Sequence, residues 1–163
     1  MTKPILVFGY GNPSRGDDAV GPLLLEHLQR QIDLTEIELQ TDFQLQIEHT
    51  LDLQDRKLVM FVDASVACRE QFAMTRLKPV RDNSYSSHAM SPTALLEAYR
   101  TVTGHMPPPS YLLSIQTETF ELGEPVNDNT LENLTQACLF AERLLGQPLT
   151  KIATMLDELS AVS

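Results

Sequence analysis

The sequence predicts a single α/β domain of three layers, in which a mainly parallel, twisted sheet of about five strands has helices on both faces. Residues 4–8 (PILVF) and 57–62 (KLVMFV) are continuous apolar runs, which are typical of parallel strands covered on both sides. Strand-like and helix-like segments alternate along the chain, and this order implies crossover connections and parallel pairing. Because 163 residues suffice for one compact core, we expect one domain over residues 1–163.

A glycine-containing loop connects the first predicted strand to the first predicted helix. The strand ends at Gly9, and the loop contains two adjacent acids, Asp17 and Asp18. The segment after these acids has apolar residues four positions apart, which is the spacing of a helix with one buried face. These residues are Val20, Leu24, Leu28 and Ile32. The chain is therefore expected to open with a strand, a loop and a helix.

The residue pattern in the middle of the chain predicts three further strands and one helix. Short strands are expected at residues 36–40 and 71–77, on either side of the apolar strand at residues 57–62. A helix is expected over residues 45–54 (LQIEHTLDLQ). Its apolar side would consist of Leu45, Ile47, Leu51 and Leu53.

The second half of the chain begins with a polar loop, residues 79–92 (PVRDNSYSSHAMSP), which contains almost nothing able to form a core. Ser91 and Pro92 then resemble an N-cap followed by a proline at the first position of a helix. The remaining elements are expected to be that helix at residues 93–102, a strand at 111–117, an amphipathic helix at about 130–145 and a helical C-terminal tail at 146–163.

The composition argues against several classes of function. A formal net charge of −10 and an isoelectric point near 4.7 disfavour binding to nucleic acids and to anionic membranes. We find neither a signal-peptide cleavage pattern nor the roughly 18 consecutive apolar residues of a membrane span in this sequence, so we expect a soluble cytoplasmic protein. Cys68 and Cys138 lack metal-ligand spacing and are expected to be reduced, structural thiols.

Three candidate functional residues are expected at the carboxyl ends of the strands, where open α/β sheets bind ligands. Asp18 follows the first strand, Asp63 ends the third, and His88 lies in the polar loop. Together they would supply two oxygens and one nitrogen to a divalent ion such as nickel, zinc, manganese or iron. Simpler roles remain open at this point: Asp17 as a helix cap, Asp63 in an Asx turn, and His88 as a solvated loop residue.

The glycine loop differs from the loops that bind phosphate. A dinucleotide fingerprint requires a third glycine at position 14, where this chain has Ser14, and the acid nearest the end of the second strand is Asp42. No GK[ST] sequence follows the loop, so it is not a P-loop either.

Three segments resemble the motifs of the hydrogenase maturation proteases, the endopeptidases that trim the C-terminal extension from the large subunit of [NiFe] hydrogenases. Residues 5–22 (ILVFGYGNPSRGDDAVGP) are similar to the family's opening motif, G-x-G-N-x-x-x-x-D-[DE]-x-x-G. Residues 59–65 (VMFVDAS) resemble its strand-to-aspartate motif, and residues 86–96 (SSHAMSPTALL) resemble its S-x-H segment before a helix. The motifs occur in the family's order, and the resemblance spans nearly the whole chain.

The resemblance implies roles for individual residues. Asp18, Asp63 and His88 match the residues that contact nickel and act in catalysis. The loop-shaping residues of the same motif are Gly9, Gly11, Asn12 and Gly21.

One segment departs from the common pattern of the family. Many relatives have D-G-G-T-x-G after the second strand, whereas this chain has residues 41–49 (TDFQLQIEH). This segment is similar to the variant in proteases that serve bidirectional, NAD(P)-linked hydrogenases. Asp42, Gln44 and Leu45 are then candidates for substrate recognition.

The resemblance further implies an endopeptidase that acts on the hydrogenase large-subunit precursor and uses nickel carried by that substrate as a recognition anchor. The metal could polarise a carbonyl or activate water, or a carboxylate could act as the general base. The sequence has no Ser-His-Asp order and no G-x-S-x-G elbow. Two alternatives are a nucleotide-binding or regulatory α/β module, and a metallohydrolase with its own permanently bound divalent ion.

Overall fold

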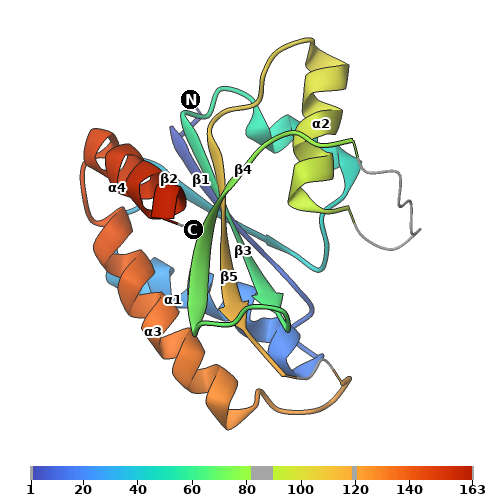
Figure 1. The fold of residues 1–163 in the computed structure, drawn as a ribbon, viewed down its shortest axis with the longest axis vertical. Helices are drawn as coiled ribbons and strands as arrows, with labels where there is room; N and C mark the ends of the chain where they lie inside the picture. The colour runs from blue at the N-terminus through green and yellow to red at the C-terminus, as the bar shows by residue number, and fades with distance from the viewer. Residues whose placement is uncertain (1, 82–89, 119–120, 163) are drawn as a thin grey trace.

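A single sheet of five strands, in the order β2-β1-β3-β5-β4, forms the centre of the molecule (Figure 1). The structure is a computed structural model that describes residues 2–81, 90–118 and 121–162. The strands are β1 (Ile5–Tyr10), β2 (Ile37–Asp42), β3 (Leu58–Ser65), β4 (Phe72–Leu77) and β5 (Ser110–Gln116). The first three and β5 pair in parallel, and β4 is antiparallel to β5 at one edge. The predicted mainly parallel sheet is confirmed.

Helices cover both faces of the sheet (Figure 1). The α-helices are α1 (Val20–Gln31), α2 (Pro92–Thr103), α3 (Asp128–Leu145) and α4 (Leu149–Val162), and the 3₁₀ helices are η1 (Gly16–Ala19) and η2 (Ile47–Leu53). Apolar residues of α1, α3 and α4 form a core against one face, and those of α2 and η2 form a core against the other. This arrangement is the predicted three-layer domain. No helix within the described residues is long and apolar enough to cross a membrane.

Strand β1 shows why its sequence is apolar at consecutive positions. Ile5 and Val7 point into the core beneath α1 and α3, while Leu6 and Phe8 point into the core beneath α2. All four side chains are at most 2% exposed. Because neighbouring side chains on a strand point to opposite faces, a strand covered on both sides needs an apolar residue at every position.

The predicted helix at residues 45–54 was wrong in type and in its buried face. The segment forms the 3₁₀ helix η2, in which Ile47 is 54% exposed and Leu51 is 70% exposed. Leu45, which precedes this helix, and Leu53 are each 1% exposed. Residues advance by about 100° along an α-helix, so even there Ile47 and Leu51 would point away from Leu45 and Leu53, and the four residues do not share one side.

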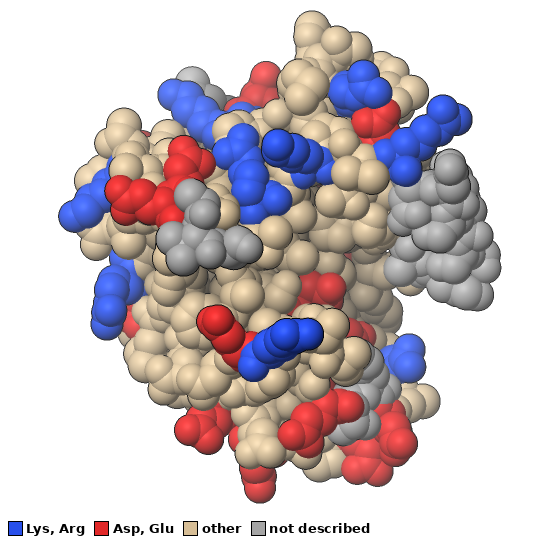
Figure 2. Space-filling view, viewed as in Figure 1, with Lys and Arg blue, Asp and Glu red and all other residues tan. Residues whose placement is uncertain are grey.

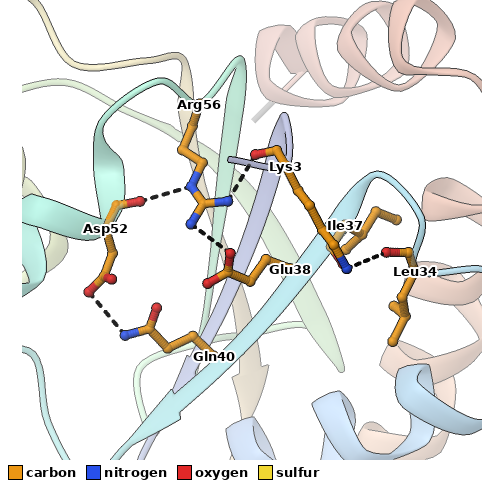
Figure 3. A network of polar contacts seen from close by, with 7 residues as sticks. All are labelled: Lys3, Leu34, Ile37, Glu38, Gln40, Asp52 and Arg56. Atoms are coloured by element: carbon orange, nitrogen blue, oxygen red, sulfur yellow. Dashed lines mark hydrogen bonds and ion pairs between the residues drawn. The ribbon is translucent and has the colours of Figure 1, made fainter. Parts of the chain in front are cut away.

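A buried guanidinium ties η2 to the amino ends of β1 and β2 (Figure 3). The Arg56 side chain is 4% exposed, and it donates to the Glu38 carboxylate over 3.0 Å, to the Lys3 carbonyl over 2.8 Å and to the Asp52 carbonyl over 2.9 Å. A buried charge with a carboxylate and two carbonyl partners retains its hydrogen bonds without water. This network closes the end of the sheet opposite to the candidate site.

Candidate active site at the carboxyl edge of the sheet

The parallel strands β1 and β3 place Tyr10 and Asp63 at the same edge of the sheet. Gly9 is paired with Val62 in the register of these strands, so Tyr10 and Asp63 are the next residues along each strand. Tyr10 packs on the α2 side with Phe8, its ring centroid 6.4 Å from that of Phe8 in an edge-on arrangement. Asp63 follows the same alternation from Phe61, which is also on the α2 side.

Asp18 reaches the same edge from the loop after β1. The half-buried carboxylate accepts a hydrogen bond of 2.7 Å from the backbone N–H of Asn12, and the Asp18 N–H donates to the Arg15 carbonyl over 3.1 Å. The Asp18 charge raises the pKa of both Tyr10 and Asp63, which shows that the three side chains interact electrostatically. The structure therefore brings two of the predicted site residues, Asp18 and Asp63, to one place.

Burial makes Asp63 an unusual carboxylic acid. Its pKa is raised from 3.8 to about 6, mainly because the charged form loses contact with water. The hydrogen bond from Tyr10 opposes this rise, the Asp18 charge adds to it, and the hydrogen bond from the Ala64 backbone opposes it again. The pKa of Tyr10 is raised well above 10.0, first by burial and then by the neighbouring Asp63 charge, so its hydroxyl keeps its proton. Asp63 is thus a carboxyl group that titrates about two pH units above an ordinary aspartate.

Glycines allow the Asp18 loop to pack directly against the strand ends. Gly11 has φ +148, and a Cβ at this position would lie 2.1 Å from the Asp18 carbonyl oxygen. A Cβ on Gly9 would lie 2.7 Å from the Gly21 carbonyl oxygen, and one on Gly21 would lie 2.8 Å from the Tyr10 carbonyl oxygen. These distances are shorter than van der Waals contact, so any side chain at these positions would push α1 and the loop away from the sheet edge.

The backbone N–H groups of the glycine loop are used within the protein. Five of them donate to internal oxygens at 2.7 to 3.1 Å, and their partners include the Asp42 carbonyl and the Asp18 carboxylate. The donors belong to Gly11, Asn12, Ser14, Arg15 and Asp18. A phosphate-binding loop needs free N–H groups aimed at its ligand, so this geometry argues against a phosphate site in the loop.

Asp17 joins the loop to a distant part of the chain. Its carboxylate is completely buried and accepts hydrogen bonds from the backbone of Glu118 and of Asn127, both at 2.7 Å, and from the Thr130 hydroxyl at 2.6 Å. The interpretation of Asp17 as a helix cap was wrong, because η1 begins after Arg15 without a side-chain cap. The acid instead holds the start of α3 against the loop that presents Asp18.

His88 lies outside the described residues. The chain resumes at Met90, whose N–H donates to the Leu45 carbonyl over 3.4 Å and whose side chain packs on the α2 side of the sheet. Ser91 is the N-cap of α2, as predicted, and its hydroxyl accepts from the Ala94 N–H at 3.2 Å. Within the described residues, no group of three His, Cys, Asp or Glu side chains is arranged to hold a metal ion.

The predicted substrate-recognition residues occupy the turn between β2 and η2. Asp42 is exposed, and its carboxylate accepts from the Phe43 N–H at 2.7 Å and pairs with His49 Nε2 at 3.1 Å. Because His49 Nδ1 accepts from the Gln46 N–H at 2.8 Å, Nε2 carries the imidazole proton. Leu45 is 1% exposed in the α2-side core, and this burial favours a packing role over direct contact with a substrate. Gln44 is half-buried.

Tyr10 and His49 contribute to this edge and were not predicted from the sequence. The signal for Tyr10 was available, because it lies two positions after Phe8 on a strand and must share its face. No comparable signal existed for His49, which the sequence places within the expected helix at residues 45–54. Its 7% exposure and its ring contact with Phe8, at 4.7 Å between centroids, arise only in the folded chain.

Comparison with known proteins gives a consistent result at the level of structure. No family model and no curated protein sequence matches the chain. A solved [NiFe] hydrogenase maturation protease, HycI from Thermococcus kodakarensis KOD1, is 21% identical with a TM-score of 0.68, over 90% of this chain and 94% of the other.

Two Escherichia coli structures are similar to the chain as well. The hydrogenase maturating endopeptidase HybD is 21% identical with a TM-score of 0.63, over 85% of this chain and 92% of the other. An endopeptidase solved in solution is 24% identical with a TM-score of 0.67, over 84% and 88%. At these identities the likeness concerns the fold, and the chain has the fold of solved hydrogenase maturation proteases.

Proposed function

We propose that this protein is an endopeptidase that removes the C-terminal extension from the nickel-loaded large-subunit precursor of a [NiFe] hydrogenase. The observation that carries the proposal is the meeting of Asp18 and Asp63 at one sheet edge, in the order and positions of the motifs that resemble the family. The shared fold of solved maturation proteases supports it.

The two carboxylates are suited to contact a divalent ion carried by the substrate. Asp18 is fixed by the Asn12 N–H, and Asp63 is held by Tyr10 and by the Ala64 backbone. Carboxylate oxygens together with the imidazole of His88 would complete the coordination of a nickel ion that the client already holds. A precursor without nickel would lose these contacts, and each tenfold loss of affinity corresponds to about 1.4 kcal/mol.

The raised pKa of Asp63 also suits proton transfer. A carboxyl group with a pKa of about 6 exists in both protonation states near neutral pH, whereas an ordinary aspartate is almost fully ionised there. In our proposal the nickel of the substrate positions the scissile peptide, and a carboxylate at this edge acts as general base: it takes a proton from the water that attacks the scissile carbonyl, and the proton then passes to the amine that departs when the C–N bond breaks. Coordination of a cation by Asp63 would favour its charged form and lower this pKa.

The turn after β2 supports one class of client. We infer that it is the large subunit of a bidirectional, NAD(P)-linked hydrogenase, since residues 41–49 resemble the variant found in proteases for such enzymes. Asp42 and Gln44 would contact the client, and Leu45 would act by packing beneath the turn.

The proposal is tested by mass spectrometry of a nickel-loaded large-subunit precursor after incubation with the protein. We expect loss of a C-terminal peptide with the unmodified protein and none with Asp63→Asn or His88→Gln. A nickel-free precursor should remain intact. Equal cleavage with and without nickel would contradict the anchoring role, and wild-type cleavage by His88→Gln would remove His88 from the site.

A further inference from the structure

One segment of this acidic protein carries a net positive charge because it contains few acidic residues. Residues 71–117 contain four Lys or Arg and two Asp or Glu, which leaves eight basic and twenty acidic residues for the rest of the chain. Figure 2 shows basic side chains over the carboxyl end of β4 and near α2, whereas acidic side chains dominate the lower end of the same face near the start of α3. The charge is therefore divided between two ends of the molecule.

A groove of about 700 Å³ lies in the basic region. Its walls are the end of β4, the exposed side of α2 and the proline-rich segment that leads into β5. Three exposed basic side chains, Arg76, Lys78 and Arg100, line it together with one acid, Glu97. The groove is at the amino end of β5, whereas Asp63 is beside Ser114, further along that strand. It is thus separate from the candidate active site.

The apolar wall of the groove is held in place before any partner binds. The Pro109 carbonyl accepts from the Val59 N–H at 2.9 Å, and the Pro108 carbonyl accepts from the Ser110 hydroxyl at 2.8 Å. Proline has a fixed φ, so this segment loses little conformational entropy when a ligand binds against it. Met106, on the same wall, is 69% exposed and offers an adaptable apolar contact.

Two of the basic groups are also fixed, each beside an acid, and the Arg100 guanidinium donates to the Glu97 carboxylate over 2.5 and 3.0 Å. The Arg76 guanidinium lies 5.0 Å from the centre of the Tyr111 ring, and it donates to the Tyr111 hydroxyl over 2.8 Å and to the Asp157 carboxylate over 3.2 Å. Within the part of the chain that the structure describes, Lys78 has no ion-pair partner. The groove thus combines two positioned guanidinium groups and an available ammonium with apolar contacts.

We propose that this groove is a docking site for an acidic, extended peptide segment of a protein partner that also carries apolar side chains. Carboxylates of the segment would pair with Lys78 and would share the Arg100 and Arg76 guanidinium groups with Glu97 and Asp157, and its apolar side chains would pack on Met106 and the prolines. A long polyanion such as nucleic acid fits poorly, because it would extend beyond the groove onto the acidic remainder of the surface, which would repel it. The inference does not depend on the proposed protease activity.

The test is fluorescence anisotropy at low ionic strength with a labelled peptide of alternating glutamate and leucine. The double variant Lys78→Glu/Arg100→Glu should bind about tenfold or more weakly than the unmodified protein. The matched control is Lys57→Glu/Lys151→Glu, which changes the net charge equally at two exposed positions outside the groove and should bind within about twofold of the unmodified protein. Met106→Ser should weaken binding without changing the charge.

Three results would overturn the proposal. The two double variants could lose affinity equally, which would show a long-range effect of net charge. A peptide with lysine in place of glutamate could bind as well as the acidic one. A single-stranded oligonucleotide or vesicles with anionic lipid could bind to the groove more tightly than the peptide, which would indicate a different class of partner. Circular dichroism of each variant establishes that it is folded.

Discussion

Thr130 donates a hydrogen bond of 2.6 Å from its hydroxyl to the Asp17 carboxylate, although the two residues are 113 positions apart in the chain. Both residues are completely buried. Asp17 is adjacent to Asp18, and Thr130 is in the first turn of α3. The contact therefore joins the loop of the candidate active site to α3, which covers the face of the sheet opposite to the one on which Tyr10 packs.

This contact predicts a large loss of stability when Asp17 is shortened. Asp17→Ala would leave the N–H groups of Glu118 and Asn127 and the Thr130 hydroxyl without their acceptor in a buried place. We expect the free energy of unfolding to fall by about 3 kcal/mol or more in urea titrations. Asp128→Ala, an exposed acid in the same region, is the control and should cost less than about 1 kcal/mol. Similar losses in both variants would contradict this role of Asp17.

We expect the substitution Asp63→Asn to raise the stability of the protein, in contrast to Asp17→Ala, and to do so in a pH-dependent way. Because the pKa of Asp63 is raised to about 6 in the folded protein, the folded state binds more protons than the unfolded state between the two pKa values. Stability should therefore decrease as the pH rises from about 4 to about 6. Asp63→Asn is neutral throughout and should be more stable than the unmodified protein by at most about 3 kcal/mol at a pH of about 7.

The difference in the free energy of unfolding between Asp63→Asn and the unmodified protein should vanish below a pH of about 4, where Asp63 is protonated in both the folded and the unfolded state. Chemical denaturation of both proteins across this range measures it. A difference that is independent of pH would show that the asparagine acts through packing and that the carboxyl group titrates normally.

We expect removal of the Tyr10 hydroxyl to shift the pKa of Asp63. The Tyr10 hydroxyl hydrogen-bonds to Asp63 and thereby lowers the pKa of that carboxyl group. Tyr10→Phe retains the ring contact with Phe8 and removes the hydroxyl, so the Asp63 midpoint should rise further in a ¹³C NMR titration of the side-chain carboxyl. Tyr99→Phe, in the same core, should leave that midpoint unchanged. An unchanged midpoint in Tyr10→Phe would show that the hydroxyl does not act on Asp63.

We expect a side chain at Gly11 to destabilise the protein mainly by a steric clash with the Asp18 loop. Gly11→Ala would place a Cβ 2.1 Å from the Asp18 carbonyl oxygen. Gly104 has φ +72 at the C-cap of α2, and a Cβ added there would meet no atom within 4 Å, so Gly104→Ala measures the cost of a left-handed backbone without a clash. We expect Gly104→Ala to cost about 1 kcal/mol in thermal unfolding and Gly11→Ala to cost considerably more. Equal costs would show that the loop can move away from Gly11.

Local regularities made much of the fold predictable. The run PILVF is apolar at every position because β1 is covered on both faces, and the same holds for the run that forms β3. Ser91 and Pro92 mark the start of α2 because N-caps and first-turn prolines act through the nearest few residues. The meeting of Asp18 and Asp63 was predictable for a related reason, since parallel strands end at a common edge.

The exceptions depend on contacts between distant segments. The segment around η2 was predicted as an α-helix, but it forms a 3₁₀ helix that begins with a capping interaction between Gln46 and His49, and it buries Leu45 and Leu53 while Ile47 and Leu51 are exposed. The burial of His49 against Phe8 likewise requires β1 and η2 to be packed together. Patterns of neighbouring residues carry no information about such packing.

The layers, the mainly parallel sheet and the edge that carries Asp18 and Asp63 can all be inferred from the order of the residues, because alternation along strands and helical spacing are local consequences of backbone geometry. Three other properties appear only once the chain is folded: Asp17 is a buried link to α3, Tyr10 and Asp18 act on Asp63, and basic side chains from β4 and α2 line one groove. These properties depend on distances between residues far apart in the chain, and on the exclusion of water that follows when they pack.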